Sequence, residues 1–210
     1  MSERGPLVES MERLTQNADD HALDRELARA AAAGDPKARR ELLDRLLDRV
    51  RTTVRYLNAG AADTDDLVQV SLVQILRSAG SFRGASRLET WADRITVRTA
   101  MRMIKARRRR PEVALEDLPV DQPGGVDPED RLSRRQVSEH LAVLLGRLSP
   151  ERRTVVTLCL VHDYRVTEIA EITGAPLNTV RDRLRVGRKQ LRKMIASDSV
   201  LADWMETVKR

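Results

Sequence analysis

The sequence predicts an all-α protein with two small helical domains joined by a flexible linker. Apolar residues make up 41% of its 210 residues but aromatic residues only 2%, so the cores must be built from Leu, Val, Ile and Ala. These residues recur at helical spacing, whereas the alternation typical of half-buried strands is absent. One stretch rich in proline, glycine and acidic residues, 111–130, separates the helical segments into two groups.

The chain starts with a polar segment, residues 1–20, that has no clear apolar periodicity. We therefore expect a flexible N-terminus there, followed by a first domain over 21–110. The first helix pattern of this domain runs from His21 to Ala33, and Gly34 ends it.

The second helix is predicted from Pro36 to about Leu57. Asp35 supplies its cap, and Pro36 suits the first turn because its missing N–H would have no partner there. The apolar face of this helix is the strongest periodic feature of the chain, which predicts that it forms core. That face consists of Leu42, Leu43, Leu46, Leu47, Val50, Val54 and Leu57.

A third helix is predicted after a break at 58–60, with Asp63 as its cap. Asp65 and Asp66 would lie in its first turn, where the helix dipole favours negative charge. Its apolar side comprises Leu67, Val68, Leu72, Ile75 and Leu76.

A loop rich in glycine and serine follows at 78–86 and contains the only phenylalanine, Phe82. The next helix is predicted from Arg87 to Lys105. Its basic residues lie three or four apart, so they form a stripe that leads into the arginine run 107–110. Such a stripe beside a loop of small residues indicates a surface that binds phosphates. The stripe is Arg94, Arg98, Arg102 and Lys105, and the residues expected to face inward are Leu88, Trp91, Ile95 and Ile104.

The acidic segment 111–130 is expected to be a linker, since its prolines and glycines oppose helix. Its charge also raises the hypothesis that it folds back on the basic domains and weakens DNA binding by the free protein. A second domain is expected over 131–196 and a tail helix over 197–210. Within that domain, Ser149 and Pro150 predict a second capped helix start.

The segment 166–193 predicts a helix-turn-helix. Gly174, in the break between its two helices, can adopt the positive φ that a helix end often needs. Pro176 suits the first turn of the second helix, and Gly187 on its apolar stripe would permit close packing. The opposite face of that helix is polar and rich in arginine, which is typical of a recognition helix in a DNA major groove. That face carries Asn178, Arg181, Asp182, Arg185, Arg188 and Lys189.

Composition restricts the function further. The net charge of +6 favours a polyanionic partner such as nucleic acid. Cys159, the only cysteine, excludes an internal disulfide, and its apolar surroundings predict a buried hydrophobic residue. The histidines His21, His140 and His162 are scattered and suggest no cluster. Motifs of nucleotide-binding enzymes, metalloproteases and serine hydrolases are absent, so we expect no enzyme, no cofactor and no bound metal.

The sequence also has no apolar run long enough to span a bilayer, and its N-terminus lacks a signal-peptide core. We therefore expect a cytoplasmic protein without a membrane span.

Two segments resemble the bacterial RNA polymerase sigma factors. The segment AADTDDLVQVSLVQILRSAGSFRG, followed by SRLETWADRITVRTAMRMIKARRRR, is similar to their region 2. LSPERRTVVTLCLVHDYRVTEIAEITGAPLNTVRDRLRVGRKQLRK is similar to their region 4. A linker stands where a third domain would lie, which is the layout of the extracytoplasmic-function group. The resemblance covers roughly residues 22–196 and implies an alternative sigma factor that binds core RNA polymerase and promoter DNA. An anti-sigma factor is a further partner that the resemblance implies.

The resemblance also implies roles for individual residues. Region 2 would dock on polymerase through Asp65, Asp66, Leu67, Gln69 and Leu72. It would capture and align the melted downstream promoter element through Phe82, Arg83, Ser86, Arg87, Trp91, Arg94, Arg98 and Arg102. Region 4 would read the upstream element through Asn178, Thr179, Arg181, Asp182, Arg185 and Arg188.

The sequence departs from the family pattern at Val70, where an acidic residue is usual, and at Pro176, where a serine cap is common. Two other functions remain open at this point. One is a helix-turn-helix regulator that binds duplex DNA without polymerase. The other is a helical interaction protein whose arginines only aid solubility.

Overall fold

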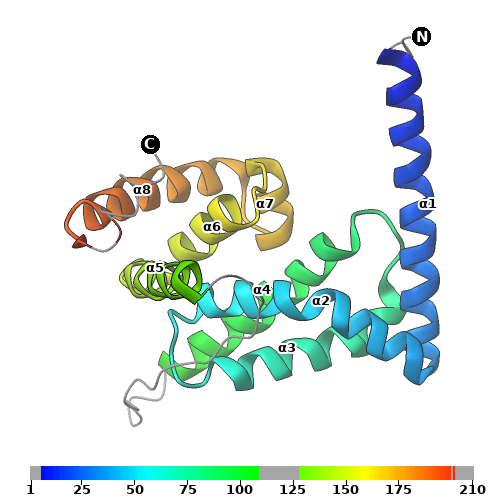
Figure 1. Cartoon of the computed structure of the whole chain (residues 1–210), viewed down its shortest axis with the longest axis horizontal. Coiled ribbons are helices and arrows are strands. Elements are labelled where there is room, and N and C mark those ends of the chain that lie inside the picture. The colour runs from blue at the N-terminus through cyan, green and yellow to red at the C-terminus, as the bar shows by residue number, and fades with distance from the viewer. Residues whose placement is uncertain (1–5, 109–127, 200, 202–210) are drawn as a thin grey trace.

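The structure, a computed structural model, describes residues 6–108, 128–199 and 201 of the chain (Figure 1). All regular secondary structure in these ranges is helical, which agrees with the predicted all-α class. The first domain contains α1 (Pro6–Ala33), α2 (Pro36–Leu57), α3 (Thr64–Ser78), the short 3-10 helix η1 (Ala79–Ser81) and α4 (Leu88–Arg108). The second contains α5 (Pro128–Gly146), α6 (Pro150–Val161), α7 (Val166–Thr173) and α8 (Leu177–Ile195).

The sequence predicted capped helix starts at Asp35-Pro36 and at Ser149-Pro150, and the structure confirms both. The carboxylate of Asp35 accepts hydrogen bonds from the backbone N–H groups of Lys37 and Ala38. The hydroxyl of Ser149 accepts one from Arg152 N–H at 3.4 Å. Both caps satisfy N–H groups that have no partner within the helix.

Helix α1 is longer than the sequence pattern predicted. It begins at Pro6, so the segment expected to be irregular is helical from residue 6 onward. The expectation rested on apolar periodicity, which this polar segment lacks. However, residues 7–20 contain neither proline nor glycine and include several strong helix formers. Figure 1 shows the N-terminal part of α1 projecting beyond the other helices.

Asp63 occupies the N-cap position of α3, but its side chain makes no capping hydrogen bond. Its carboxylate instead accepts hydrogen bonds from Asn58 Nδ2 at 2.7 Å and from Arg107 Nη1 at 2.6 Å. The predicted helix start is therefore right, but the predicted role of the side chain is wrong. This carboxylate ties the end of α4 to the start of α3.

The buried face of α4 also differs from the expected one. Leu88 and Ile104 are buried as expected, whereas Trp91 and Ile95 are only half-buried. Small and polar residues, which a search for large apolar side chains overlooks, complete the buried face. They are Ala92, Asp93, Thr96, Val97, Thr99 and Ala100.

The helix-turn-helix has the predicted geometry. Gly174 ends α7 with φ +68°, in the left-handed region, as the sequence predicted. Pro176 sits at the N-cap of α8, one position before the predicted first turn. Gly187 is buried against α6, and a Cβ at this position would lie only 2.6 Å from Val156 Cγ2. The missing side chain therefore permits the close approach of the two helices.

The two domains pack directly on each other in this structure. Helix α2 contacts α5 and α6, and α4 contacts α7. Arg153, a buried residue of α6, joins them by donating to the backbone carbonyl oxygen of Leu57 in α2 at 2.8 Å. Its guanidinium also donates to the carbonyl oxygens of Leu145, Gly146 and Leu148. The guanidinium of Arg153 thus binds carbonyl oxygens at the C-terminal end of α5 and in the turn that follows, and it links both to α2.

Two predicted segments lie largely outside the described residues. The linker 111–130 does so up to residue 127, and its last three residues belong to α5. Of the tail 197–210, the structure describes Leu201, which is buried, and residues 197–199.

Candidate nucleic-acid and polymerase interfaces

The loop predicted to capture a melted base packs on an aromatic pair, the buried Phe82 and the half-buried Trp91. Phe82 is only 6% exposed, and its ring packs on that of Trp91 with centroids 5.4 Å apart. Arg83 and Arg87 are exposed on either side of Gly84, which adopts φ +71°. Ser86 donates a hydrogen bond to the carbonyl oxygen of Arg87 at 3.3 Å. The aromatic pair therefore supports the loop from inside, while the arginines present charge to solvent.

A cavity of about 450 Å³ opens beside this loop. Phe82 and Arg83 line one wall together with Ala79 and Gly80. The other wall comes from α1, a helix for which no functional role was predicted. The α1 residues of this cavity are Ala22, Arg25, Glu26 and Arg29.

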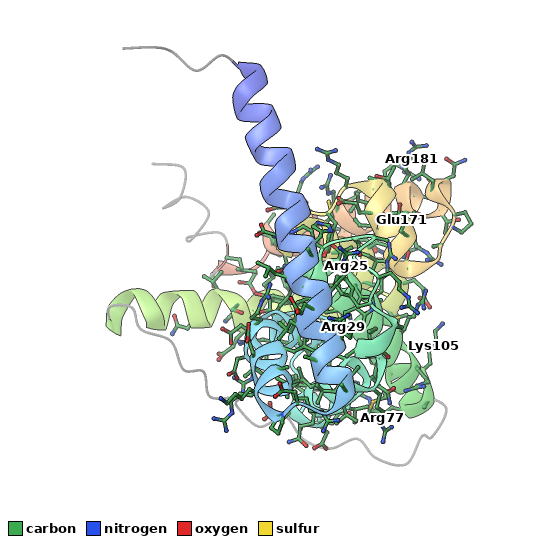
Figure 2. The ribbon with its side chains drawn as sticks, turned by 90° about the vertical axis from the view of Figure 1, so that its right-hand side faces the viewer. Arg25, Arg29, Arg77, Lys105, Glu171 and Arg181 are labelled. Carbon is green, nitrogen blue, oxygen red and sulfur yellow. The ribbon has the colours of Figure 1, made fainter. Side chains whose placement is uncertain are left out.

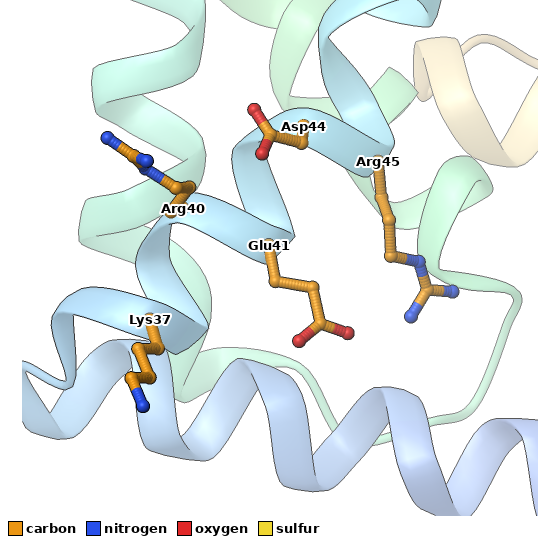
Figure 3. A pocket seen from close by; sticks show the side chains of 5 residues that line it. All are labelled: Lys37, Arg40, Glu41, Asp44 and Arg45. Carbon is orange, nitrogen blue, oxygen red and sulfur yellow. The ribbon is translucent and has the colours of Figure 1, made fainter.

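A second hollow, of about 510 Å³, lies along α2 and contains charges of both signs (Figure 3). Arg45 on its rim pairs with Asp24 of α1 at 2.7 Å. Because carboxylates alternate with cations here, this hollow suits a phosphate less well than the cavity beside Arg83. Its lining residues are Lys37, Arg40, Glu41, Asp44 and Arg45.

The basic stripe of α4 borders the second domain. Arg98 and Arg102 are exposed, as a phosphate-binding role requires. Arg94 instead pairs with Glu171 of α7 at 2.7 Å, and Lys105 approaches Glu151 of α6 at 3.9 Å. In this closed arrangement of the two domains, part of the stripe is therefore occupied by carboxylates of the same chain.

The polar face of α8 points outward, as expected of a recognition helix. Arg181, Asp182, Arg185 and Arg188 are exposed, and Asn178 is exposed beside half-buried Thr179. Arg181 Nη1 donates to Asn178 Oδ1 at 3.1 Å, and Arg185 lies 3.6 Å from Asp182. These contacts lie at the surface, so they are weak and easily exchanged for contacts with DNA.

Arg188 is oriented differently, because its Nη2 lies 2.9 Å from Cys159 Sγ in α6. Cys159 is half-buried, rather than buried as the sequence predicted. Arg188 therefore rests against the body of the domain, whereas Arg181 extends from it (Figure 2).

The predicted polymerase-docking residues of α3 divide into two groups. Asp65, Asp66 and Gln69 are exposed and available to a partner. Leu67 is 1% exposed and belongs to the core, while Leu72 is half-buried. Leu67 thus supports this surface from beneath instead of presenting its side chain.

A buried polar network joins the two domains, and the sequence did not reveal it. Asp93 of α4 is fully buried and pairs with Arg49 of α2 at 2.8 Å. From the second domain, the Tyr164 hydroxyl donates to Asp93 Oδ2 at 2.7 Å and accepts from Arg49 Nη2 at 2.9 Å. His162 Nε2 lies 2.7 Å from Thr53 Oγ1. These residues come from three distant segments, in α2, in α4 and after α6, so no local motif could have indicated the whole network.

Burial sets the titration of this network. It raises the pKa of Tyr164 to about 12, and the nearby Asp93 carboxylate adds to the shift, so the phenol keeps its proton. Burial lowers the pKa of His162 below 6.5; Arg49 lowers it further, while Asp93 and Asp163 partly offset both effects. Burial by itself would lower the pKa of Arg49, but the charge of Asp93 and its hydrogen bond have the larger combined effect and raise that pKa. The network therefore contains a neutral histidine and one compensated ion pair.

Two family models match the chain in the order that the resemblance implies. Sigma-70 region 2 matches residues 42–110, and Sigma-70, region 4 matches residues 138–191. The ECF RNA polymerase sigma-E factor of Haemophilus influenzae is 31% identical over 181 residues, which cover 82% of this chain and 95% of that protein. The chain belongs to the ECF group of RNA polymerase sigma factors.

Other relatives of this sigma factor agree. The ECF RNA polymerase sigma-E factor of Escherichia coli is 31% identical over 177 residues, which cover 80% of this chain and 92% of that protein. ECF RNA polymerase sigma factor SigE of Mycolicibacterium smegmatis is 32% identical over 163 residues, which cover 76% of this chain. The match spans only 62% of the length of that last relative.

Two solved structures share the fold of this sigma factor. CnrH in complex with the cytosolic domain of CnrY has a TM-score of 0.59 at 22% identity, covering 84% of this chain and 99% of CnrH. The sigma factor RpoE of Bartonella quintana, in complex with the anti-sigma factor NepR, has a TM-score of 0.58 at 21% identity. That match covers 76% of this chain and 97% of RpoE.

Metal and membrane sites are lacking in the part of the sigma factor that the structure describes. No group of three or more His, Cys, Asp or Glu side chains there could hold a metal ion. Within the same ranges, no helix combines the length and apolar character that a bilayer crossing needs.

Proposed function

We propose that this sigma factor binds core RNA polymerase, directs it to a set of promoters and helps to open them. The observation that carries this proposal is the presence of two separate exposed basic surfaces on two domains of one chain. One is the outward arginine face of α8, and the other is the loop with the exposed arginines of α4. A protein that only reads duplex DNA needs the first surface but not the second.

The upstream promoter element would be read by α8. Its exposed Arg181 and Arg185 can reach base edges in a major groove, where arginine bonds guanine in a bidentate manner. Each such pair is worth about 1–3 kcal/mol of discrimination. Asn178, Thr179 and Asp182 lie on the same N-terminal half of the helix, which is the end that enters the groove in this class of motif.

The melted strand would lie across the first domain. Unstacking costs a few kcal/mol per base step, and holding a displaced base in a pocket offsets this cost. The loop that carries Arg83, Ser86 and Arg87 stands beside such a pocket, and Arg98 and Arg102 continue the basic surface along α4. Polymerase would dock on the exposed Asp65, Asp66 and Gln69 of α3. Catalysis of RNA synthesis would belong to the polymerase, so the sigma factor itself would need no cofactor.

The partners and location follow from this role. A factor that works on polymerase and the chromosome acts in the cytoplasm. An anti-sigma factor is a further proposed partner, supported by the complex of the sigma factor RpoE, which shares the fold, with the anti-sigma factor NepR.

Transcription with purified components tests the proposal. The sigma factor is added to its cognate core polymerase with a library of genomic fragments, and transcript start sites are mapped. We expect discrete start sites that appear only when the sigma factor is present. Initiation that is no more specific than with core polymerase alone would refute the proposal. Tight, sequence-specific binding to duplex DNA without polymerase would favour a helix-turn-helix regulator instead.

A double substitution tests the assignment of α8. Arg181→Ala with Arg185→Ala should reduce initiation at promoters with an upstream element by at least tenfold, because up to two base contacts are lost. Binding to core polymerase in a pull-down should stay unchanged. Arg192→Ala, at an exposed position in the last turn of α8, is the matched control and should leave both properties intact. Equal loss of initiation and polymerase binding would contradict the assignment.

A further inference from the structure

The cavity beside the loop at Phe82 and Arg83 has a second wall, formed by α1, whose residues have no predicted role. Arg25 and Arg29 of α1 line it opposite Phe82 and Arg83, together with the small residues Ala79 and Gly80. Its volume of about 450 Å³ lies within the range of small-molecule sites, which is about 300–1,000 Å³. Figure 2 labels Arg25 and Arg29 on α1.

Helix α1 is held against the loop by specific contacts. His21 Nδ1 lies 3.0 Å from the carbonyl oxygen of Gly84. A Cβ on Gly84 would lie 2.7 Å from Arg25 Cδ, so the stem of Arg25 rests directly on the loop backbone. A Cβ on Gly80 would lie 3.4 Å from that of Ala32. Because these contacts fix both walls, the cavity exists before any ligand arrives, which lowers the entropic cost of binding.

The chemistry of the lining defines the ligand. Three guanidinium groups, on Arg25, Arg29 and Arg83, face one carboxylate, Glu26. Glu26 approaches Arg29 only at 3.9 Å, and both side chains are more than 70% exposed, so this pair is weak. The net positive charge attracts an anion such as a backbone phosphate, whereas Phe82 and Ala79 are almost fully buried and offer little apolar surface to a ligand.

We propose that α1 forms part of the promoter-binding surface and that Arg25 and Arg29 bind backbone phosphates of the melted DNA strand beside the loop. The proposal rests on the proposed function, because it needs a strand that is opened beside the loop. It extends the single-stranded DNA site from the loop and α4 to a helix that lies more than fifty residues earlier in the chain.

Binding of single-stranded DNA measures the contribution of α1. The probe is a fluorescent single-stranded oligonucleotide pool of random sequence, titrated with the full chain in complex with core polymerase at several salt concentrations. The variant Arg25→Gln with Arg29→Gln should bind at least about tenfold more weakly. Its log–log salt slope should fall by about 1.4, since each phosphate contact to a single strand contributes about 0.7. Arg29→Gln alone, at a side chain 81% exposed, leaves the fold intact and should lower the slope by about 0.7.

A matched variant separates site binding from general charge. Arg40→Gln with Arg51→Gln removes the same charge from exposed positions of α2 outside the cavity and should change affinity less than twofold. If the α1 variant binds as tightly as this control, the proposal is wrong. A free deoxynucleoside monophosphate should not displace the oligonucleotide at equal concentration. Displacement would mean that the cavity is a mononucleotide site and would also overturn the proposal.

A cross-link gives a readout that a purely structural role of α1 would not produce. A photoreactive amino acid in place of the exposed Ala22 should cross-link to the non-template strand in an open promoter complex. The promoter is one that the wild-type factor uses in the transcription experiment above. If wild-type protein initiates there but no cross-link to either strand forms, α1 lies away from the DNA while the proposed function stands. If wild-type protein does not initiate, the proposed function itself fails.

Discussion

The Tyr164 hydroxyl offers a way to loosen the closed arrangement of the two domains without disturbing either one. It belongs to the second domain, but it donates to Asp93 and accepts from Arg49, which both lie in the first. Tyr164→Phe removes only this hydroxyl and keeps the ring, whose centroid lies 5.5 Å from Arg49 Cζ. Asp93 and Arg49 keep each other as partners after the change.

The magnitude follows from the burial and charge of the partners. A hydrogen bond to a charged group contributes about 1.5–3 kcal/mol, and Tyr164 is only 8% exposed, so solvent cannot replace the lost hydroxyl readily. We expect the closed arrangement to lose about 2–3 kcal/mol. Since 1.4 kcal/mol corresponds to a factor of ten, the ratio of closed to open molecules should fall about 30- to 140-fold.

Energy transfer between two dyes measures the opening. Cysteines at Arg77→Cys and Lys189→Cys, both exposed, carry the dyes in a Cys159→Ala background, and the signal is followed across a urea series. Tyr164→Phe should shift domain separation to lower urea. Tyr56→Phe is the control, because its half-buried hydroxyl forms a neutral interdomain hydrogen bond with Ser138 at 3.0 Å, which should contribute only about 0.5–1.5 kcal/mol. The same midpoint for Tyr164→Phe and wild type would refute the reasoning.

Three further changes test the packing. Because the pKa of His162 is lowered in the closed arrangement, stability should be full above about pH 6.5 and decline as the pH falls below it; His162→Gln should flatten this decline in the dye assay. Gly187→Ala should destabilise by about 1 kcal/mol, since overpacking against Val156 exceeds the gain in helix propensity, and thermal unfolding at an unchanged or higher temperature would contradict this. Arg153→Lys should cost about 2–4 kcal/mol in urea unfolding, because lysine cannot reproduce the fork to several carbonyl oxygens, whereas Arg152→Lys next to it should change stability by less than about 0.5 kcal/mol.

Features that depend on neighbouring residues could be predicted from the sequence. The caps at Asp35 and Ser149 and the left-handed turn at Gly174 are local, since their contacts lie within three or four residues. Gly187 was predictable because it interrupts an apolar stripe whose period was clear. The all-α class and the family resemblance are confirmed for the same reason, as both rest on ordered local patterns.

Features that depend on distant residues were not predictable. The bond between Asp63 and Arg107 spans 44 positions in sequence, so local capping rules favoured the wrong partner. His162 appeared isolated in the sequence, yet its partner Thr53 lies 109 positions away. One feature of the sequence could have indicated that Asp93 is buried, because its carboxylate lies on a side of the helix that is otherwise occupied by small residues. Without the fold, that signal could not name Tyr164 as its partner.

The polar groups within the contact between the two domains have a consequence for solubility. Groups such as Thr53, Asp93 and Arg94 can be rehydrated when the halves of the molecule part, because each one is a strong donor or acceptor toward water. Leucine or phenylalanine side chains in their place would instead expose an apolar patch whenever the domains separate, and such patches favour aggregation. If the two domains separate, these polar groups would therefore promote aggregation less than leucine or phenylalanine side chains at the same positions.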